Sequence, residues 1–256
     1  MTAARTGGGR TDDGHGRLGR TLSGLAVAVG CVLFLGSFVW GALVYRPYLV
    51  PTDSMTPSVR AGDRVLAERI DGADVRRGDI VVFRLAAWGG TPMVKRVVAT
   101  GGDTVACCGR DGRLTVNGTP VTEPYLRTAG PASPTAFSTT VPDEQLFLLG
   151  DERNNSLDSR EHLQDAAGGS VPRSAVEARL DAVVWPLSGA FLERPEGFAD
   201  LPGGISRMGP VKTILWSMAA GALLVFGGGL HDPVRRALRR RRERREQRTE
   251  AVTDAG

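Results

Sequence analysis

The chain has 256 residues, of which 41% are hydrophobic and 23% are charged, and its formal net charge is +4. Residues 45–210 hold 18 basic and 21 acidic residues, so the positive excess belongs to the two ends of the chain. This balance excludes the broad basic surface that a nucleic-acid-binding domain needs. No cysteines and histidines stand at zinc-ligand spacing, and we expect neither a metal nor another cofactor.

The N-terminal part predicts a membrane anchor. Residues 22–44 form an uncharged apolar stretch of 23 residues, which is long enough to span a bilayer. Aromatic residues at its end (Trp40, Tyr45 and Tyr48) resemble an interfacial belt, whereas a cleaved signal peptide would have a shorter apolar region and a small-residue cleavage site. We predict an uncleaved anchor, preceded by a disordered, Gly-rich tail at residues 1–21.

A second apolar stretch, residues 211–230, carries Lys212 near its start and is followed by an arginine-rich tail at residues 231–256. Basic residues beside a span mark its cytoplasmic end. We therefore predict two transmembrane helices, cytoplasmic termini and an extracytoplasmic domain at residues 45–209. The lipid bilayer is an expected partner, with anionic lipid at the basic tail, and nucleic acid is not.

The central domain is predicted to be mostly β, because short β-branched runs alternate with tight turns. We expect a compact, barrel-like domain. Asn117-Gly118 after residues 113–116 predicts a hairpin, and residues 128–140, rich in Pro, Ala, Ser and Thr, predict a surface loop. The expected strands are residues 64–67, 79–84, 93–99, 113–116, 145–149 and 178–184.

The three cysteines predict little covalent cross-linking. Cys31 lies in the first apolar stretch and is expected to pack there. Cys107 and Cys108 are adjacent, and neighbouring Cα atoms about 3.8 Å apart fall below the usual disulfide range. We expect two separate buried thiols, with a strained vicinal disulfide as the alternative.

Ser54 is the candidate nucleophile. It lies in a stretch just beyond the first apolar segment, bracketed by Pro51 and Pro57 and rich in turn-forming side chains. A lone serine in such a position is an ordinary juxtamembrane turn residue. A lysine in the central domain gives it a partner.

The chain has only two lysines, Lys95 and Lys212, and uses arginine for its other basic side chains. Lys95 lies in a β-branched run whose alternation places Met93, Val97 and Ala99 on its own face and Arg96 on the other. Apolar neighbours lower the pKa of an ammonium group, and a neutral lysine can act as a general base where a guanidinium cannot. We predict a Ser54–Lys95 dyad.

Three stretches of the sequence together resemble the bacterial type I signal peptidase family, over roughly residues 22–186. They are Pro51-Thr52-Asp53-Ser54-Met55-Thr56-Pro57, Val94-Lys95-Arg96-Val97, and the stretch Gly150–Arg160, GDERNNSLDSR. The resemblance implies that Ser54 and Lys95 are catalytic, and that the Ser54 N–H and the Thr52 hydroxyl stabilise the oxyanion. It further implies that Ser156 hydrogen-bonds Lys95.

The same resemblance implies that Asp158 and Arg160 pair to hold their loop. It implies an enzyme of the bacterial plasma membrane that cuts signal peptides from exported pre-proteins after small-x-small sites, through an acyl-enzyme. The fold it implies is a barrel-like β domain between two transmembrane helices.

Two other readings stay open. A Ser-His-Asp hydrolase would use His162, the single histidine of residues 45–210, with Asp158 or Asp165 beside it, but no Gly-x-Ser-x-Gly elbow surrounds Ser54. The other is a catalytically inactive, membrane-tethered binding or assembly module of the same fold. Such a module would be expected to have lost the serine or the lysine, and this chain has both.

Overall fold

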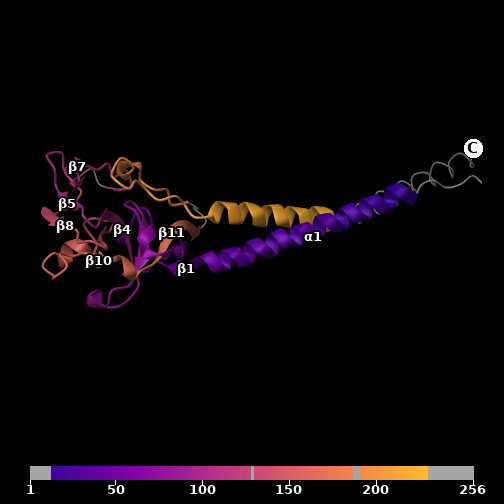
Figure 1. Cartoon of the computed structure of the whole chain (residues 1–256), viewed down its shortest axis with the longest axis horizontal. Coiled ribbons are helices and arrows are strands. Elements are labelled where there is room, and N and C mark those ends of the chain that lie inside the picture. The colour runs from indigo at the N-terminus through magenta and orange to yellow at the C-terminus, as the bar shows by residue number, and fades with distance from the viewer. Residues whose placement is uncertain (1–12, 128–129, 187–190, 230–256) are drawn as a thin grey trace, which may run out of the picture. The chain divides into compact units, whose positions relative to one another are not determined.

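The computed structural model describes residues 13–127, 130–186 and 191–229 (Figure 1). The chain divides into two compact units, residues 1–41 with 212–256 and residues 42–211, which are described separately. The described part of the first unit is helical, and the second unit contains all of the described strands.

The helical unit is built from α1 (Asp13–Val44) and a C-terminal helix (Val211–Gly229), both long and apolar enough to cross a membrane. Two glycines let the helix backbones approach closely, since a Cβ on Gly30 would lie 2.8 Å from the Gly221 carbonyl oxygen. Ser23 Oγ also donates a 2.6 Å hydrogen bond to the Gly228 carbonyl.

The start of α1 differs from the prediction. Residues 13–20 were expected to be a disordered tail, but they continue the helix of the apolar segment. Extending a helix that already exists fixes one residue per hydrogen bond, so polar residues can join it at little cost. Residues 1–12 and 230–256, which include the predicted basic tail, lie outside the described residues.

The second unit contains two antiparallel sheets, which confirms the predicted mostly β domain. The larger sheet has seven strands in the order β1-β2-β11-β3-β4-β9-β10, and the smaller has four in the order β7-β6-β5-β8. Bulges within β4 and β11 curve the larger sheet into a half-barrel whose edges are β1 and β10. The strands of the larger sheet are β1 (Tyr45–Leu49), β2 (Arg64–Glu68), β3 (Ile80–Phe83), β4 (Met93–Thr100), β9 (Gln145–Leu149), β10 (Val171–Pro172) and β11 (Val176–Trp185). Those of the smaller sheet are β5 (Thr104–Cys107), β6 (Thr115–Val116), β7 (Thr119–Pro120) and β8 (Phe137–Thr140).

Strand β4 lies between β3 and β9 near the middle of the larger sheet. All four residues of β3 are buried, and β9 is buried from Leu146 to Leu149, so both neighbours of β4 belong to the core. Apolar runs of this kind are typical of strands covered on both faces. The charged pair Lys95 and Arg96 is therefore held in the interior of the domain, and both side chains are buried.

The predicted hairpin forms, with Asn117 (φ 53°) and Gly118 (φ 77°) as the two turn residues between β6 and β7. The predicted surface loop at residues 128–140 is only partly correct. Its last four residues form β8, which pairs with β5, and Ala132, Ser133 and Phe137 are buried. Phe137 stacks on Phe147 with ring centroids 5.6 Å apart, and this apolar contact turns a polar-looking stretch into part of the core.

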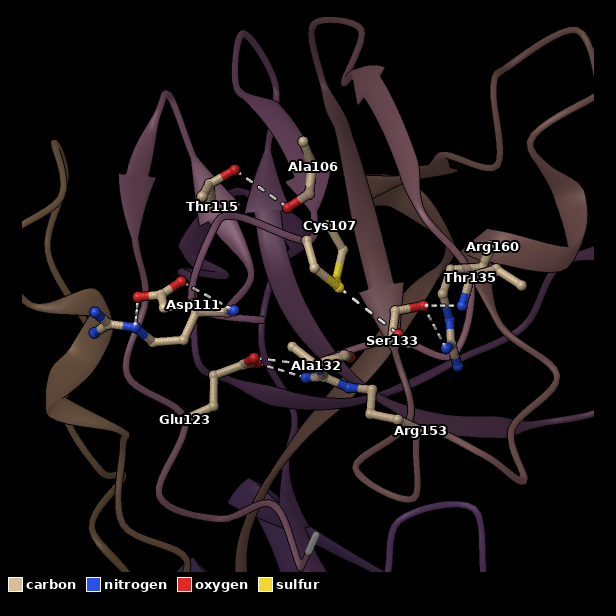
Figure 2. Close-up of a disulfide and its surroundings, with 12 residues drawn as sticks. Ala106, Cys107, Asp111, Thr115, Glu123, Ala132, Ser133, Thr135, Arg153 and Arg160 are labelled. Atoms are coloured by element: carbon tan, nitrogen blue, oxygen red, sulfur yellow. Dashed lines mark hydrogen bonds and ion pairs between the residues drawn. A yellow bond between two sulfur atoms is a disulfide. The ribbon is translucent and has the colours of Figure 1, made fainter. Parts of the chain in front are cut away.

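The cysteine prediction was wrong, because Cys107 and Cys108 are joined by a vicinal disulfide at the end of β5. The Cα atoms are 2.9 Å apart, closer than the trans spacing on which the prediction relied. Cys108 Sγ lies 3.7 Å from the Ser133 carbonyl oxygen, and Figure 2 shows that Ser133 also faces Arg160.

Candidate functional site

The loop between β1 and β2 holds Ser54 in a fixed position. Met55 is fully buried and anchors the loop, while Asp53 Oδ1 accepts a 3.0 Å hydrogen bond from the Ala61 N–H. The loop closes at its base, where the Val50 N–H donates to the Asp63 carbonyl over 2.9 Å. Ser54 itself is only 8% exposed, although the three residues before it are exposed.

Strand β4 brings Lys95 to this loop. Lys95 Nζ donates to Ser54 Oγ over 2.7 Å, and Thr52 Oγ1 lies 3.3 Å from the same oxygen. Lys95 is 3% exposed and forms no ion pair with any residue that the structure describes. Burial lowers the pKa of Lys95 to about 8, although the Asp158 and Asp151 carboxylates oppose the shift. A large fraction of this lysine is thus neutral near pH 8.

Arg96 has the opposite environment. Its guanidinium binds the Asp151 carboxylate through two hydrogen bonds of 2.8 and 2.7 Å and lies 3.9 Å from the centre of the Tyr125 ring. It also donates to Ser58 Oγ and to the Gly78 carbonyl. Burial favours the neutral form of Arg96, but the paired carboxylate outweighs it and raises the pKa. Arg96 therefore stays charged and ties the Ser54 loop to the residues after β9.

The Gly150–Arg160 loop follows β9 and packs against the serine. The Glu152 N–H donates to the Ser54 carbonyl over 3.0 Å. Asp158 accepts the Gly150 N–H over 3.0 Å and binds the Arg160 guanidinium through two hydrogen bonds of 2.9 and 2.8 Å. Burial opposes ionisation of Asp158, yet these donors hold its pKa below the usual value. Asp158 and Arg160 thus form a buried pair that fixes the backbone at Gly150.

Ser156 does not make the predicted hydrogen bond to Lys95. Its hydroxyl is buried and interacts with the Asp158 carboxylate, which helps to lower the pKa of Asp158. Ser156 instead packs against Gly150, where an added Cβ would lie 2.1 Å from Ser156 Oγ and 2.5 Å from the Ser54 carbonyl oxygen. Gly150 is therefore the point at which both serines approach one backbone, and no larger residue fits there.

Arg153 extends this framework toward the smaller sheet. Its guanidinium pairs with the Glu123 carboxylate and donates to the Ala132 carbonyl over 2.7 Å, as Figure 2 shows. Arg153 Nε also donates to the Gly150 carbonyl over 3.0 Å. Sequence reasoning did not single out Arg153 or Asp151, although both lie in the motif that carries Ser156 and Asp158. Both are charged residues in a stretch without a predicted helix or strand, and this was the sequence signal that could have pointed to them.

A cleft of about 370 Å³ opens beside Ser54 and Lys95. We call it the Ser54 cleft. Its walls come from residues 50–55, part of the turn-rich loop between β1 and β2, and from residues 91–95, which lead into β4. Most of its larger side chains are apolar, namely Val50, Met55, Trp88, Met93, Val94 and Leu157.

His162 lies apart from the serine. Its ring stacks on Trp88 with centroids 4.1 Å apart, and Nδ1 is 3.0 Å from Asp165 Oδ2. No contact joins His162 to Ser54 among the residues that the structure describes, whereas Lys95 contacts Ser54 directly. The geometry does not assemble a Ser-His-Asp triad around Ser54.

Comparison with known proteins identifies the family. Residues 20–185 match the family described as "Signal peptidase, peptidase S26". Signal peptidase I of Mycobacterium tuberculosis (strain ATCC 25618 / H37Rv) is 32% identical over 232 residues, covering 70% of this chain and 78% of its own. Signal peptidase I of Leptolyngbya laminosa is 34% identical over 151 residues, covering 54% and 68% of the two chains. A crystal structure of a signal peptidase I from Enterococcus faecalis V583 is 30% identical, covers 41% of this chain and 95% of its own, and superimposes with a TM-score of 0.34.

The match with the family model includes the Ser54 loop, strand β4 and the Gly150–Arg160 loop. Together with the similarity over most of the Mycobacterium tuberculosis chain, it confirms the resemblance found in the sequence. The chain belongs to the signal peptidase family, a family of peptidases.

Proposed function

We propose that this chain is a membrane-anchored serine endopeptidase that removes signal peptides from exported pre-proteins after small-x-small sites. Ser54 is the nucleophile and Lys95 the general base. The observation that carries the proposal is the 2.7 Å contact from Lys95 Nζ to Ser54 Oγ, made by a buried lysine without a carboxylate partner among the described residues.

The reaction runs through an acyl-enzyme. Neutral Lys95 takes the Ser54 hydroxyl proton as Ser54 Oγ attacks the carbonyl carbon of the scissile bond. The protonated lysine then gives its proton to the leaving amine, and the signal peptide remains as an ester on Ser54. Lys95 next removes a proton from water, which attacks the ester carbonyl. The bond to Ser54 Oγ then breaks, Lys95 returns the proton to Ser54, and the signal peptide leaves with a free carboxyl end.

The oxyanion of the tetrahedral intermediate is stabilised by the Ser54 N–H and the Thr52 hydroxyl. Two observations support these roles. The Ser54 N–H donates to no other described residue, and Thr52 Oγ1 lies 3.3 Å from Ser54 Oγ. Donors held in place before the reaction need no rearrangement, and loss of one typically lowers the rate about 10²–10³-fold.

The Ser54 cleft takes the end of the signal peptide in an extended conformation. The β4 backbone at residues 93–95, which β9 does not pair, can hydrogen-bond an added strand, and apolar side chains limit the depth available to substrate side chains. Small residues before the scissile bond fit such shallow apolar pockets. The site is supported by three residues of the loop after β9 that hold Gly150 against Ser54, namely Ser156, Asp158 and Arg160.

The two apolar helices would tether the domain to the bilayer at both ends. We propose that it faces the extracytoplasmic side of a bacterial plasma membrane, with the termini in the cytoplasm. A tethered enzyme meets its substrates while their signal peptides are still in the membrane, so binding starts from a high effective concentration.

Cleavage of a purified pre-protein tests the proposal. The full chain in detergent should release the mature protein with an N-terminus that follows a small-x-small sequence, and Ser54→Ala should be inactive. A serine-directed acylating inhibitor should add its acyl mass to Ser54 in the wild type and not in Ser54→Ala. Full activity of Ser54→Ala, or no cleavage by a folded wild type, would overturn the proposal. His162→Ala should cleave at close to the wild-type rate, because His162 contacts Trp88 and not Ser54.

A further inference from the structure

The Ser54 cleft has two apolar sides that differ in how much of their surface is already covered. On one side, Val50 and Met55 are 2% and 0% exposed, and both belong to one buried apolar cluster of the domain. Val94 of β4 packs against the same cluster. We call these three residues the buried side of the cleft. Because their side chains are packed into the core, this side offers a substrate a shallow surface with little depth.

The other side of the cleft is open. Trp88 and Met93 are half-buried and pack against a different apolar cluster. Met93 and Val94 are neighbours in β4, where successive side chains alternate, so the two clusters lie on opposite faces of this strand. Leu157 lines the cleft from the Gly150–Arg160 loop and is 57% exposed. We call Trp88, Met93 and Leu157 the open side, because they line the cleft while part of each side chain remains uncovered.

Contacts within the domain hold the Trp88 ring in place. It packs edge-on against Phe83, with ring centroids 5.7 Å apart, and stacks on His162 with centroids 4.1 Å apart. His162 is the last residue of the short helix η3 (Ser159–His162), which begins two residues after Leu157. The stack therefore joins the two loops that carry Trp88 and Leu157. Because the ring is already ordered, a substrate side chain can pack on it at a small entropic cost.

The path of the substrate determines which of its residues meets each side. Ser54 and Lys95 line the same cleft, and β9 pairs with β4 only from Arg96 onwards, so residues 93–95 can pair with an added strand. Such a strand presents successive side chains to opposite faces of β4. The first and third residues of a small-x-small site thus face one side, and the middle residue x faces the other. Small residues suit the buried side, which places x against the open side.

We infer that the open side of the Ser54 cleft binds the middle residue of the cleavage site and selects a large apolar side chain there. An apolar side chain covers the uncovered surface of Trp88 and Leu157, whereas a polar side chain of the same size loses hydrogen bonds to water. Trp88 and Leu157 are then specificity-determining residues. This inference rests on the proposed signal-peptide cleavage and refines it, because x becomes a selected position.

Peptides with the site Ala-x-Ala test the inference, with x as Leu or Asn, two side chains of similar size and shape. The full chain should cleave the Leu peptide about three- to tenfold more efficiently, in kcat/KM, since burying a leucine side chain is favourable and an open site covers only part of it. A ratio of one or less, with both peptides cleaved, would overturn the inference and leave the proposed function standing.

Variants of the open side test the residues. Trp88→Ala/Leu157→Ala should bring the Leu/Asn ratio close to one, while cleavage still requires small residues at the two outer positions because the buried side is intact. Leu157→Ala alone removes a mostly exposed side chain, so it should lower the ratio in part without disturbing the core. Trp185→Ala is the matched control and should keep the wild-type ratio, since Trp185 is 58% exposed and does not line the cleft. A preference that survives in the double variant would overturn the inference.

Photo-cross-linking separates this inference from the proposed function, because it needs no cleavage. A peptide that carries a diazirine analogue of leucine at x is irradiated with the Ser54→Ala chain, and the adducts are mapped by mass spectrometry. Adducts on residues of the open side support the inference even if the wild type cleaves no peptide. Adducts on residues of the buried side, or none that excess unlabelled peptide suppresses, contradict it even if cleavage is efficient.

Discussion

The two faces of strand β4 place neighbouring cations in opposite environments. Arg96 binds Asp151 through two hydrogen bonds, and the pairing raises its pKa. Lys95, one residue earlier, is equally buried but contacts a hydroxyl, and burial lowers its pKa to about 8. A buried ion is normally either paired or neutral, and this strand contains one example of each.

Because of this difference, Arg96 has a structural role and Lys95 can take part in the reaction. The paired cation keeps its charge and links the Ser54 loop to the Gly150–Arg160 loop through Ser58 and Asp151. The unpaired cation can lose its proton, which the proposed mechanism requires. The framework that holds Ser54 and Lys95 together is thus built from charged residues; in it, the pKa values of Arg96 and Arg153 are raised and that of Asp158 is lowered.

The largest expected effect comes from Lys95→Arg, which makes the two faces of β4 alike. The variant keeps a positive charge but removes the neutral base, so kcat/KM on a signal-peptide substrate should fall at least about 10³-fold. Lys212→Arg, which changes the other lysine of the chain, should leave it unchanged. Substantial activity in Lys95→Arg would place the base elsewhere.

Arg96→Gln breaks the paired face instead. It leaves the Asp151 carboxylate buried without its partner, and the free energy of unfolding should fall by about 3–5 kcal/mol. Arg113→Gln breaks an exposed pair with Asp111 and should hardly change the free energy of unfolding. Chemical denaturation of the full chain measures both.

A double replacement sharpens the comparison at Arg96. Arg96→Met with Asp151→Leu removes both charges together and should restore most of the lost stability, because no unpaired ion remains in the interior. If Arg96→Gln proved no more destabilising than Arg113→Gln, the ion pair would not be a main support of the Ser54 loop.

Gly150→Ala tests the contact between the two loops. An alanine Cβ would meet the Ser54 carbonyl and the Ser156 side chain, so the serine must shift relative to Lys95. A displacement of about 1 Å can lower a rate about 10²-fold, and we expect a loss of that size in kcat. Gly130→Ala is the control, since a Cβ at Gly130 meets nothing within 4 Å. Equal rates for both variants would contradict the close packing at Gly150.

The smallest effect is expected from the vicinal disulfide. A cross-link between adjacent residues closes almost no loop, so it restricts the unfolded chain little. Cys107→Ala/Cys108→Ala should therefore change the free energy of unfolding by about 1 kcal/mol or less and leave kcat/KM close to that of the wild type. A large loss of activity would show that the contact from Cys108 to Ser133 supports the Arg160 side of the site.

The sequence predicted the parts of the fold that depend on local patterns. Strands β3, β4 and β9 follow from β-branched runs and turn residues, and the hairpin follows from Asn117-Gly118. The approach of Ser54 and Lys95 was inferred from residue types and from a resemblance to known motifs, and the structure places the two side chains in contact.

The features that sequence reasoning missed depend on contacts between distant segments. Strand β8 forms because Phe137 packs on Phe147, which no local pattern shows. The orientation of Ser156 is set by its packing against Gly150, so the expected hydrogen bond to Lys95 is absent. Arg153 contacts two residues, Glu123 and Ala132. Both lie about 20 to 30 residues earlier in the chain.

The pH dependence of Ser54 acylation tests the neutral lysine most directly. A serine-directed inhibitor is reacted with the full chain from pH 6 to 10, and the acyl adduct is followed by mass spectrometry. Lys95 must be deprotonated to act, so the rate should rise about tenfold per pH unit below pH 8 and level off above it, following the pKa of about 8. A rate that does not change between pH 6 and 8, or one that keeps rising to pH 10, would contradict the role proposed for Lys95.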